Sequence, residues 1–332
     1  MNDKTGAAGA RPGQPRPLRA AVLYPLSEVQ RAGLAKVAGA RCQISFYEDP
    51  GELSPAIRDA DIIMGWLRPS QLSEAASLKW YQAASSGIEA YAGALAGRGG
   101  VVLTNASGAY GGSISEFMLT YALMLLKHMP QYLRAQDRHE WGFLGSSRSL
   151  GDCVAAVIGL GDLGSSLAKK LHALGATVLG VKNTRAPKPG YLDALYCAEE
   201  IDAPLRDADI VALCLPSTPA TRGIMSRQRI FALKPGAILL NAGRGDAIDQ
   251  AALVEALKEK RIFAGLDVTV PEPLPKVHPL WELENLVLTP HVTGGRNYEY
   301  ARGFIGGLFA RNLEAFLDGR PLENTVDIKR GY

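Results

Sequence analysis

The first third of the chain is a series of short apolar runs separated by more polar, helix-like or turn-rich segments. Runs of this length between turn residues indicate strands, and their alternation with helices indicates crossover connections. We therefore predict a small α/β domain with a parallel sheet. The expected strands are Ala20–Tyr24, Ile44–Phe46, Ile62–Met64, Trp80–Ala83 and Val101–Leu103.

A second series of apolar runs follows in the second half of the chain, again with helix-like segments between them. Six strands make a full doubly wound dinucleotide-binding sheet, which binds its ligands beyond the carboxyl ends of the strands. The residues directly after each strand are therefore the candidate site. The expected strands are Val154–Ile158, Thr177–Val181, Ile210–Leu215, Ala237–Asn241, Ala264–Asp267 and Leu286–Leu288.

The two series are joined by a segment with helical periodicity. Residues 113–126 carry apolar side chains at helical spacing after Gly111 and Gly112, so we predict a helix that connects two domains. Residues 131–149 are more polar, and Trp141 stands alone among them. An isolated Trp of this kind is more typical of packing or of a subunit interface than of a catalytic site.

The first strand of the second series leads directly into Gly159, Gly161 and Gly164, and a helix-prone stretch follows at once. The first glycine permits a tight turn, the second lets a pyrophosphate approach the backbone, and the third lets helix and strand pack closely. The pyrophosphate would lie on the free N–H groups at the start of the helix. A Gly-rich turn without a ligand is the alternative, but a second strand after Gly175 completes the expected βαβ unit.

The second strand of this series leads into Lys182, Asn183, Thr184 and Arg185, where NAD-binding domains usually carry an acidic residue. Two cations and a hydroxyl would hold the 2′-phosphate of NADP by charge-assisted hydrogen bonds. We therefore expect NADP(H) as the preferred cofactor, with NAD(H) as the second option. A basic loop that is simply solvated is the alternative.

Charged residues follow later strands of the same sheet. Arg244 stands between Gly243 and Gly245, and its forked guanidinium suits a carboxylate. Of the five histidines, His291 alone directly follows a strand of this sheet, and Glu272 precedes it in a proline-rich loop. A carboxylate orients an imidazole and favours its protonated form, so the two side chains could be a general acid and its partner. A surface Arg in a turn and an ordinary surface pair are the alternatives.

Turns after two strands of the first domain carry further candidates. Trp66 and Arg68 follow the third strand, and Ser86 and Gly87 follow the fourth. Consecutive backbone N–H groups at a glycine turn can hold a carboxylate. A plain turn glycine explains these residues equally well.

Composition narrows the class of protein. Of the 332 residues 47% are apolar and 21% are charged, with a net charge of +3, so no nucleic-acid-binding surface is expected. Residues 1–17 are rich in Gly and Pro and are expected to form a disordered tail. No signal peptide or membrane-spanning run is visible. The four cysteines are scattered, which favours buried thiols in a reducing cytoplasm over disulfides or a metal site.

Together these motifs resemble those of the D-isomer-specific 2-hydroxyacid dehydrogenase family, which includes glyoxylate and hydroxypyruvate reductases. The resemblance runs from about Leu18 to Asp327 and depends on the order of the motifs rather than on any one of them. The motifs are Gly159-Leu160-Gly161-Asp162-Leu163-Gly164, Leu215-Pro216, Asn241-Ala242-Gly243-Arg244-Gly245, Gly265-Leu266-Asp267-Val268, Glu272-Pro273-Leu274-Pro275 and Thr289-Pro290-His291.

The resemblance implies a two-domain α/β fold. A Rossmann dinucleotide-binding domain, residues 112–297, would be inserted in a smaller flavodoxin-like substrate domain made of residues 18–111 and 298–332. The helical stretch Tyr300–Leu317 would return to that first domain. The family's dimers imply a homodimer through the cofactor domains, in which the segment around Trp141 could take part.

The resemblance also implies roles for single residues. Arg244 would bind the carboxylate and keto oxygen of the substrate, His291 would be the acid/base, and Glu272 would assist it. Asp267 would contact the nicotinamide carboxamide, and the N–H groups of Ser86 and Gly87 would complete the carboxylate site. Cofactor contacts are expected from Gly159, Leu160, Gly161, Asp162, Leu163, Gly164, Lys182, Asn183, Thr184, Arg185, Leu215, Pro216, Thr221, Ala242, Gly243, Arg244, Asp267, His291 and Gly294.

The activity implied is reduction of a small 2-keto acid, such as glyoxylate or hydroxypyruvate, to the D-2-hydroxy acid by hydride transfer from NAD(P)H. A cytoplasmic enzyme without a membrane or nucleic-acid partner is expected. Larger acids stay open, because Trp66, Arg68, Tyr110 and Trp141 cannot be placed from the sequence. A redox-sensing binding protein similar to the C-terminal-binding corepressors is the alternative, since such proteins share the fold and keep Arg, Glu and His.

Two departures from the family pattern affect these expectations. Lys182 replaces the acidic residue of NAD-preferring members, which supports NADP(H) and weakens an assignment as phosphoglycerate dehydrogenase. No further domain is expected after Tyr332, so regulation by an appended amino-acid-binding module is not expected either.

Overall fold

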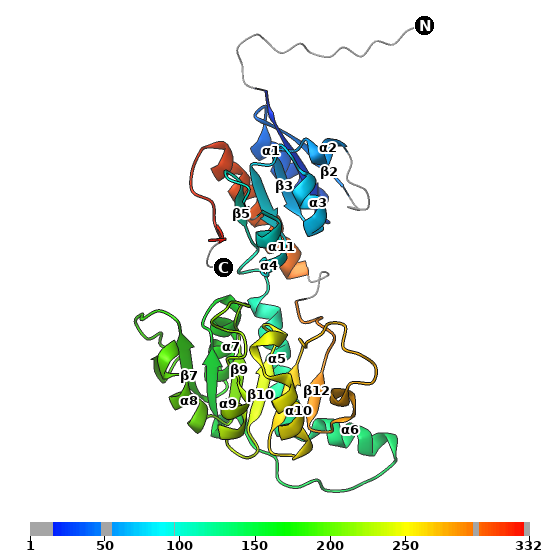
Figure 1. The fold of residues 1–332 in the computed structure, drawn as a ribbon, viewed down its shortest axis with the longest axis vertical. Helices are drawn as coiled ribbons and strands as arrows, with labels where there is room; N and C mark the ends of the chain where they lie inside the picture. The colour runs from blue at the N-terminus through cyan, green and yellow to red at the C-terminus, as the bar shows by residue number, and fades with distance from the viewer. Residues whose placement is uncertain (1–15, 48–54, 96, 295–298, 329–332) are drawn as a thin grey trace. The chain divides into compact units, whose positions relative to one another are not determined.

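The computed structural model describes residues 16–47, 55–95, 97–294 and 299–328. The chain divides into two compact units, each with its own parallel sheet (Figure 1). Unit 1 comprises the chain up to Ala106 together with Arg302–Lys329, and unit 2 comprises Ser107–Ala301.

Most of the expected disordered tail lies outside the described residues, which begin at Arg16. Arg16 itself is not a free tail residue, because its guanidinium donates to the buried carboxylate of Asp61 at 2.8 Å. Arg16, which the prediction assigned to the tail, is therefore held to unit 1.

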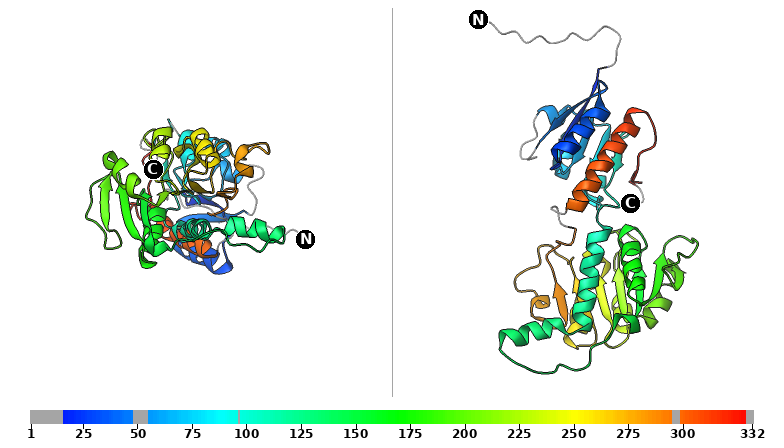
Figure 2. Two further views of the ribbon diagram at one scale, coloured as in Figure 1. Left: turned by 90° about the horizontal axis from the view of Figure 1, so that it is seen from below. Right: turned by 180° about the vertical axis from the view of Figure 1, so that it is seen from behind.

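Unit 1 contains a five-stranded parallel sheet in the order β2-β1-β3-β4-β5, which is the flavodoxin-like order. The last helix of the chain, α11, packs on this sheet beside α1 (Figure 2), and Phe316 stacks on Trp80 with ring centroids 5.2 Å apart. The elements are β1 (Leu18–Leu23), α1 (Glu28–Ala38), β2 (Cys42–Phe46), α2 (Pro55–Arg58), β3 (Ile62–Gly65), α3 (Pro69–Glu74), β4 (Trp80–Ala83), α4 (Glu89–Leu95), β5 (Val102–Thr104) and, from Arg302 onward, α11 (Glu299–Leu317).

Unit 2 contains a seven-stranded parallel sheet in the order β12-β11-β10-β9-β6-β7-β8. The order reverses between β6 and β9, the switch point at which doubly wound sheets bind ligands. The elements are α5 (Gly111–Leu126), α6 (Met129–Asp137), η1 (Leu150–Asp152), β6 (Val154–Ile158), α7 (Asp162–Ala173), β7 (Thr177–Lys182), β8 (Ala194–Cys197), η2 (Ala198–Glu200), α8 (Asp202–Asp207), β9 (Ile210–Leu213), α9 (Arg227–Ala232), β10 (Ile238–Asn241), η3 (Gly245–Ala247), α10 (Gln250–Lys258), β11 (Phe263–Leu266), η4 (Pro279–Glu282) and β12 (Leu286–Leu288).

Alternate residues of the unit 2 strands face two separate hydrophobic cores. On β6, Ala156 and Ile158 belong to the core covered by α8, α9 and α10. Ala155 and Val157 belong to the core covered by α5 and α7. Because helices cover both faces, the central strands need apolar side chains at every position, which explains the continuous apolar runs of the sequence.

The sheet of unit 2 has one more described strand than the six that the sequence predicts. The additional strand, β8, lies at the edge, pairs with β7 and has half-buried side chains. Its residues form a run of four apolar side chains, and so short a run does not by itself distinguish a strand from a helical or irregular segment. Among the described helices none is long and apolar enough to cross a membrane.

Candidate active site

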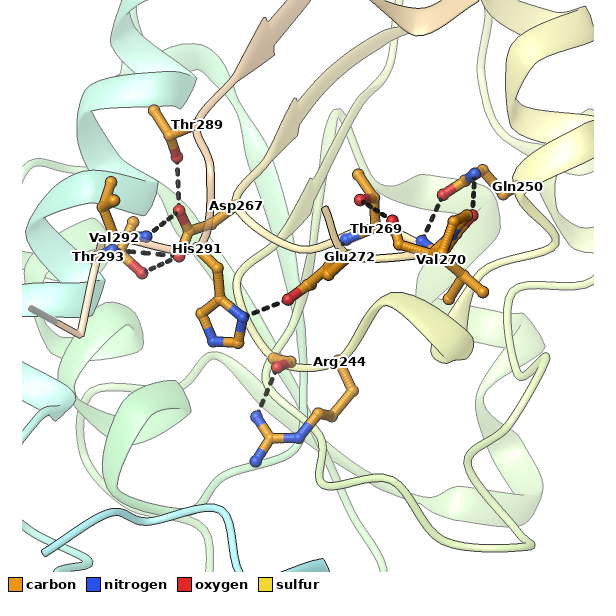
Figure 3. A network of polar contacts seen from close by, with 12 residues as sticks. Arg244, Gln250, Asp267, Thr269, Val270, Glu272, Thr289, His291, Val292 and Thr293 are labelled. Atoms are coloured by element: carbon orange, nitrogen blue, oxygen red, sulfur yellow. Dashed lines mark hydrogen bonds and ion pairs between the residues drawn. The ribbon is translucent and has the colours of Figure 1, made fainter. Parts of the chain in front are cut away.

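The carboxyl edge of the unit 2 sheet gathers the loops that carry most candidate residues. The strands β7, β6, β9, β10, β11 and β12 are consecutive neighbours in one parallel sheet, so their carboxyl ends meet at one edge. Figure 3 shows this for the residues that follow β10, β11 and β12. The loop residues of unit 2 therefore form one candidate site.

The glycine loop after β6 has the packing that a pyrophosphate requires. A Cβ atom at Gly159 would lie 2.6 Å from the Cys214 carbonyl oxygen, and one at Gly164 would lie 1.8 Å from the Gly159 oxygen. At Gly161, by contrast, a Cβ atom would meet nothing within 4 Å. The outer glycines are thus needed for close packing, while the middle one faces open space at the start of α7, where an anion would bind. The loop fits a dinucleotide.

Asp162, the first residue of α7, is directed away from this open space. Its Oδ2 accepts hydrogen bonds from the N–H groups of Gly108 at 3.1 Å and Gly111 at 2.8 Å. The carboxylate therefore holds the segment that leads into α5. Leu160 and Leu163 are half-buried against the core of α5 and α7.

The basic loop after β7 is open to solvent. Lys182 is the half-buried last residue of β7, and Asn183, Thr184 and Arg185 are exposed. Neither Lys182 nor Arg185 forms an ion pair with an acidic side chain in the described part of the chain. Their charges are therefore available to an anion.

Thr221 forms hydrogen bonds within the loop after β9. The Thr221 hydroxyl donates to the Pro216 carbonyl oxygen at 2.6 Å and accepts from the Thr218 N–H at 2.9 Å. Leu215 and Pro216 are half-buried at the strand end. Thr221 thus shapes this loop from within.

The Arg244 loop is held by the side chain of Asn241. Asn241 accepts from the Gly243 N–H at 3.0 Å and donates to the Arg244 carbonyl oxygen at 2.8 Å. Gly243 and Gly245 pass so close to neighbouring loops that a Cβ atom would lie 2.8 Å and 2.5 Å, respectively, from a backbone oxygen. The backbone is thus fixed on both sides of Arg244, whose Nη1 donates to the Gly243 oxygen at 2.8 Å. Ala242 is buried, and Gly294, beyond His291, is half-buried.

The structure brings His291 and Glu272 together. The distance from His291 Nδ1 to Glu272 Oε2 is 2.6 Å, and Glu272 Oε1 accepts from the Thr269 N–H at 3.0 Å. Figure 3 shows the His291 ring pointing to Glu272, and Arg244 follows β10, the strand beside β11 in the same sheet. The imidazole side chain is 53% exposed. An oriented imidazole with one nitrogen engaged and an open side can donate or accept a proton at its other nitrogen.

Asp267 lies directly after β11 and is buried, with 2% of its surface exposed. Its carboxylate accepts hydrogen bonds from Thr289, Val292 and Thr293, which flank His291 (Figure 3). The Asp267 carboxylate therefore holds the loop after β12 through hydrogen bonds.

The remaining candidates do not belong to the loops at the carboxyl edge of the unit 2 sheet. Ser86 and Gly87 follow β4 in unit 1, and their N–H groups donate no hydrogen bond to a described residue. In unit 1, Trp66 is half-buried beside Tyr24, with ring centroids 6.5 Å apart, and Arg68 is exposed. In unit 2, Tyr110 is buried before α5, whereas Trp141 is fully exposed, which excludes packing of Trp141 within the chain.

Sequence reasoning missed the side chains that support these loops. Asn241, Thr289 and Thr293 lie inside or next to recognised motifs, but nothing in their spacing indicates hydrogen bonds to Arg244 or Asp267. Gln250 on α10 is similar: it exchanges two hydrogen bonds with the Val270 backbone, near Glu272. Only their positions in the sequence could have indicated these supporting residues, because each lies near the end of a strand or the start of a helix.

Comparisons with known proteins show which family the chain is similar to. The model of the D-isomer specific 2-hydroxyacid dehydrogenase NAD binding domain matches residues 119–293. The chain is 31% identical to a D-3-phosphoglycerate dehydrogenase of Methanocaldococcus jannaschii, over 83% of this chain and 53% of that protein. It is 30% identical to glyoxylate/hydroxypyruvate reductase A of Serratia proteamaculans, over 83% of this chain and 88% of that protein.

A solved structure gives the same result for the fold. The NADPH-dependent glyoxylate/hydroxypyruvate reductase of Sinorhizobium meliloti, in complex with NADP and sulfate, has a TM-score of 0.80 and 27% identity, and the match covers 95% of this chain and all of that one. The two-domain α/β fold with a Rossmann domain is thereby confirmed. The chain belongs to the D-isomer-specific 2-hydroxyacid dehydrogenases, oxidoreductases that use a nicotinamide dinucleotide and act on CH–OH donors.

Proposed function

We propose that the chain reduces a small 2-keto acid of the glyoxylate or hydroxypyruvate type to the D-2-hydroxy acid, with NADP(H) as its preferred cofactor. The observation that carries the proposal is the 2.6 Å hydrogen bond between His291 Nδ1 and Glu272 Oε2, at the sheet edge that also carries Arg244 (Figure 3). The similarity to glyoxylate/hydroxypyruvate reductases supports this substrate class.

In the proposed mechanism His291 is the proton donor. Its Nδ1 donates to Glu272, so the protonated ring presents Nε2–H to the carbonyl oxygen of the substrate. That proton passes to the oxygen as C2 is reduced, and the half-exposed ring regains a proton from solvent. Glu272 stabilises the imidazolium and fixes its orientation, and the Thr269 N–H fixes Glu272 in turn. Bound NADPH would supply the hydride.

Arg244 is proposed to bind the substrate carboxylate and to polarise the keto oxygen. A guanidinium offers two parallel N–H groups to a carboxylate, and it keeps its charge at any physiological pH. The Asn241 side chain positions the backbone from which Arg244 extends. The N–H groups of Ser86 and Gly87 are proposed as further donors to the carboxylate.

The cofactor preference rests on the loop after β7. Lys182 and Arg185 carry two positive charges without an acidic partner among the described residues. A 2′-phosphate would be held there by charge-assisted hydrogen bonds, whereas the ribose 2′-hydroxyl of NAD needs an acidic acceptor. The glycine loop and the start of α7 would hold the pyrophosphate.

Two further expectations stay proposals. The side chains of Trp141 and Phe143 are 105% and 83% exposed and form an apolar surface. A second copy of unit 2 would cover this surface in a homodimer, so the native mass should be twice that of the chain.

All four cysteines are free thiols, as in proteins of reducing compartments, which supports a cytoplasmic location.

The experiment that tests the proposal is turnover with a panel of 2-keto acids. NADPH oxidation is measured with glyoxylate, hydroxypyruvate, pyruvate and phenylpyruvate, and again with NADH, and the chirality of the product is determined. We expect turnover of the small acids, a D-product and a lower KM for NADPH than for NADH. Arg185→Ala should raise the KM for NADPH about tenfold, by loss of a charged hydrogen bond, and leave the KM for NADH unchanged. Binding of NADPH without turnover of any acid would contradict the proposal.

A further inference from the structure

The buried Asp267 carboxylate accepts four hydrogen bonds from the loop after β12. Oδ1 accepts from the Thr289 hydroxyl at 2.6 Å and from the Val292 N–H at 2.9 Å. Oδ2 accepts from the Thr293 N–H at 3.1 Å and from the Thr293 hydroxyl at 2.5 Å. An ionised carboxylate has about four acceptor positions, and all four are used here. We call Asp267, Thr289, Val292 and Thr293 the Asp267 clamp.

The donors of the clamp lie on both sides of His291 in the sequence. The His291 N–H donates to the Asp267 carbonyl oxygen at 2.8 Å. His291 has φ +53°, in the left-handed region that non-glycine residues rarely adopt. The loop thus bends around the Asp267 carboxylate, and this bend directs the imidazole towards Glu272 (Figure 3).

A second hydrogen bond connects the clamp to α5. The Tyr121 hydroxyl lies 2.5 Å from Thr289 Oγ1. A threonine hydroxyl has one proton, and Thr289 donates it to Asp267, so Tyr121 must be the donor in this second bond. The order is therefore Tyr121 O–H to Thr289 Oγ1–H to Asp267 Oδ1. Tyr121 is buried, with 2% of its surface exposed.

We propose that Tyr121 and Thr289 are positioning residues for His291, acting through Asp267. The inference rests on the proposed function, in which His291 donates the proton. The clamp also bears on the family-based expectation that Asp267 contacts the nicotinamide, because a cofactor N–H would have to displace one of four existing donors. Loss of the Thr289 or Tyr121 hydroxyl weakens the hold on the loop and lets the imidazole move from its productive position, while the substrate and cofactor contacts stay in place.

The kinetic test uses substitutions that remove or retain one hydroxyl. Thr289→Val and Tyr121→Phe keep the shape of the side chain, and Thr289→Ser keeps the hydroxyl. Thr120→Val is the matched control, since that exposed hydroxyl of α5 donates only to the Glu116 carbonyl oxygen. We expect kcat to fall about tenfold or more in the first two variants, because small misplacements of a catalytic group are costly, and to stay within about twofold in the other two. The KM for NADPH should change less than about twofold in all four.

Two kinetic results would overturn the proposal. The first is a wild-type kcat in Thr289→Val. The second is a raised KM for NADPH at unchanged kcat, which indicates a cofactor contact rather than positioning of His291.

A spectroscopic test separates this inference from the proposed function. The chain has five histidines, and comparison of ¹⁵N-histidine spectra with a His291→Gln variant assigns the ring N–H of His291. This resonance should show the hydrogen bond to Glu272 in the wild type and in Thr289→Ser, and should be lost or broadened in Thr289→Val. An identical resonance in Thr289→Val would refute the positioning role, whether or not the enzyme reduces any keto acid of the panel.

Discussion

At the scale of single residues, the site consists of side chains whose backbones are held by neighbours. Asn241 holds the backbone on both sides of Arg244, and the hydrogen bonds of Asp267 hold the backbone on both sides of His291. Arg244 and His291 themselves contribute little to the cores of unit 2. Their replacement should therefore change the chemistry and leave the fold intact.

Arg244→Lys tests whether binding of the substrate carboxylate needs the forked guanidinium group or only a positive charge. Lys keeps the positive charge but cannot bind a carboxylate through two parallel N–H groups. We expect kcat/KM for the keto acid to fall about 10²-fold, comparable to loss of one donor at a developing oxyanion. Steady-state kinetics measure this, and Arg227→Lys, which changes a surface pair with Glu255, is the control. Unchanged kcat/KM in Arg244→Lys would assign substrate binding to another residue.

The chemically distinctive residues of the candidate site can be selected from the sequence, whereas the residues that support them cannot. Arg244, Glu272 and His291 are identifiable because few residue types can bind a carboxylate or move a proton, and each directly follows a strand or lies in a marked loop. In the sequence, Tyr121 is an ordinary core residue and Thr289 an ordinary turn residue. Only the fold brings the Tyr121 hydroxyl of α5 to 2.5 Å from Thr289 Oγ1, in the loop after β12. A contact between segments that are distant in the sequence produces no local sequence pattern from which it could be predicted.

At the scale of elements, the turn between β6 and α7 combines a packing requirement with a binding requirement. The glycines on its outer positions contact backbone atoms, and the middle glycine faces open space. The two requirements can therefore be separated by single substitutions.

Gly164→Ala should destabilise the fold, whereas Gly161→Ala should weaken cofactor binding. The new methyl group at Gly164 would overlap the Gly159 oxygen, with an expected loss of roughly 1–3 kcal/mol in the free energy of unfolding. At Gly161 the loss should be at most about 1 kcal/mol, but the Kd for NADPH should rise at least about tenfold. Chemical denaturation and fluorescence titration measure these values, with Gly190→Ala as the control because its Cβ would meet nothing. An unchanged Kd in Gly161→Ala would place the pyrophosphate elsewhere.

Asp61 joins the amino ends of three unit 1 strands and should make stability depend on pH. Burial opposes its ionisation, but hydrogen bonds from the Arg19 N–H, Arg16 and Lys79 outweigh that cost and lower the pKa of the carboxyl. Because the folded-state pKa lies below the unfolded value of about 3.9, the stabilisation is present above about pH 4 and is lost as pH falls through the folded-state pKa.

Asp61→Asn should therefore cost roughly 2 kcal/mol at neutral pH and progressively less in acid. Denaturation curves at a series of pH values measure the difference from wild type. Asp59→Asn, at an exposed and weakly paired carboxylate, should show no such dependence. A pH-independent difference for Asp61→Asn would mean that its role is purely steric.

Strands were predictable wherever both faces of the sheet are buried. The apolar runs mark the central strands of both units, because most side chains of these strands are buried on one face of the sheet or the other. The half-buried edge strand β8 was not predicted, and strand order had to come from the structure.

At the scale of the whole molecule, the family follows from the ordered set of motifs and is confirmed by the comparisons. The substrate does not follow in the same way. Its pocket depends on where side chains such as Trp66 and Tyr110 lie, and these positions are determined by long-range packing rather than by local sequence.

His291 is proposed to deliver the proton, and His291→Gln removes that proton donor. Gln is similar in size but cannot carry the charge, so kcat should fall about 10²- to 10⁴-fold while the Kd for NADPH changes less than about twofold. Turnover with the best keto acid and titration of the cofactor are measured on the same preparation. A variant that binds NADPH and keeps a near wild-type kcat would contradict the claim.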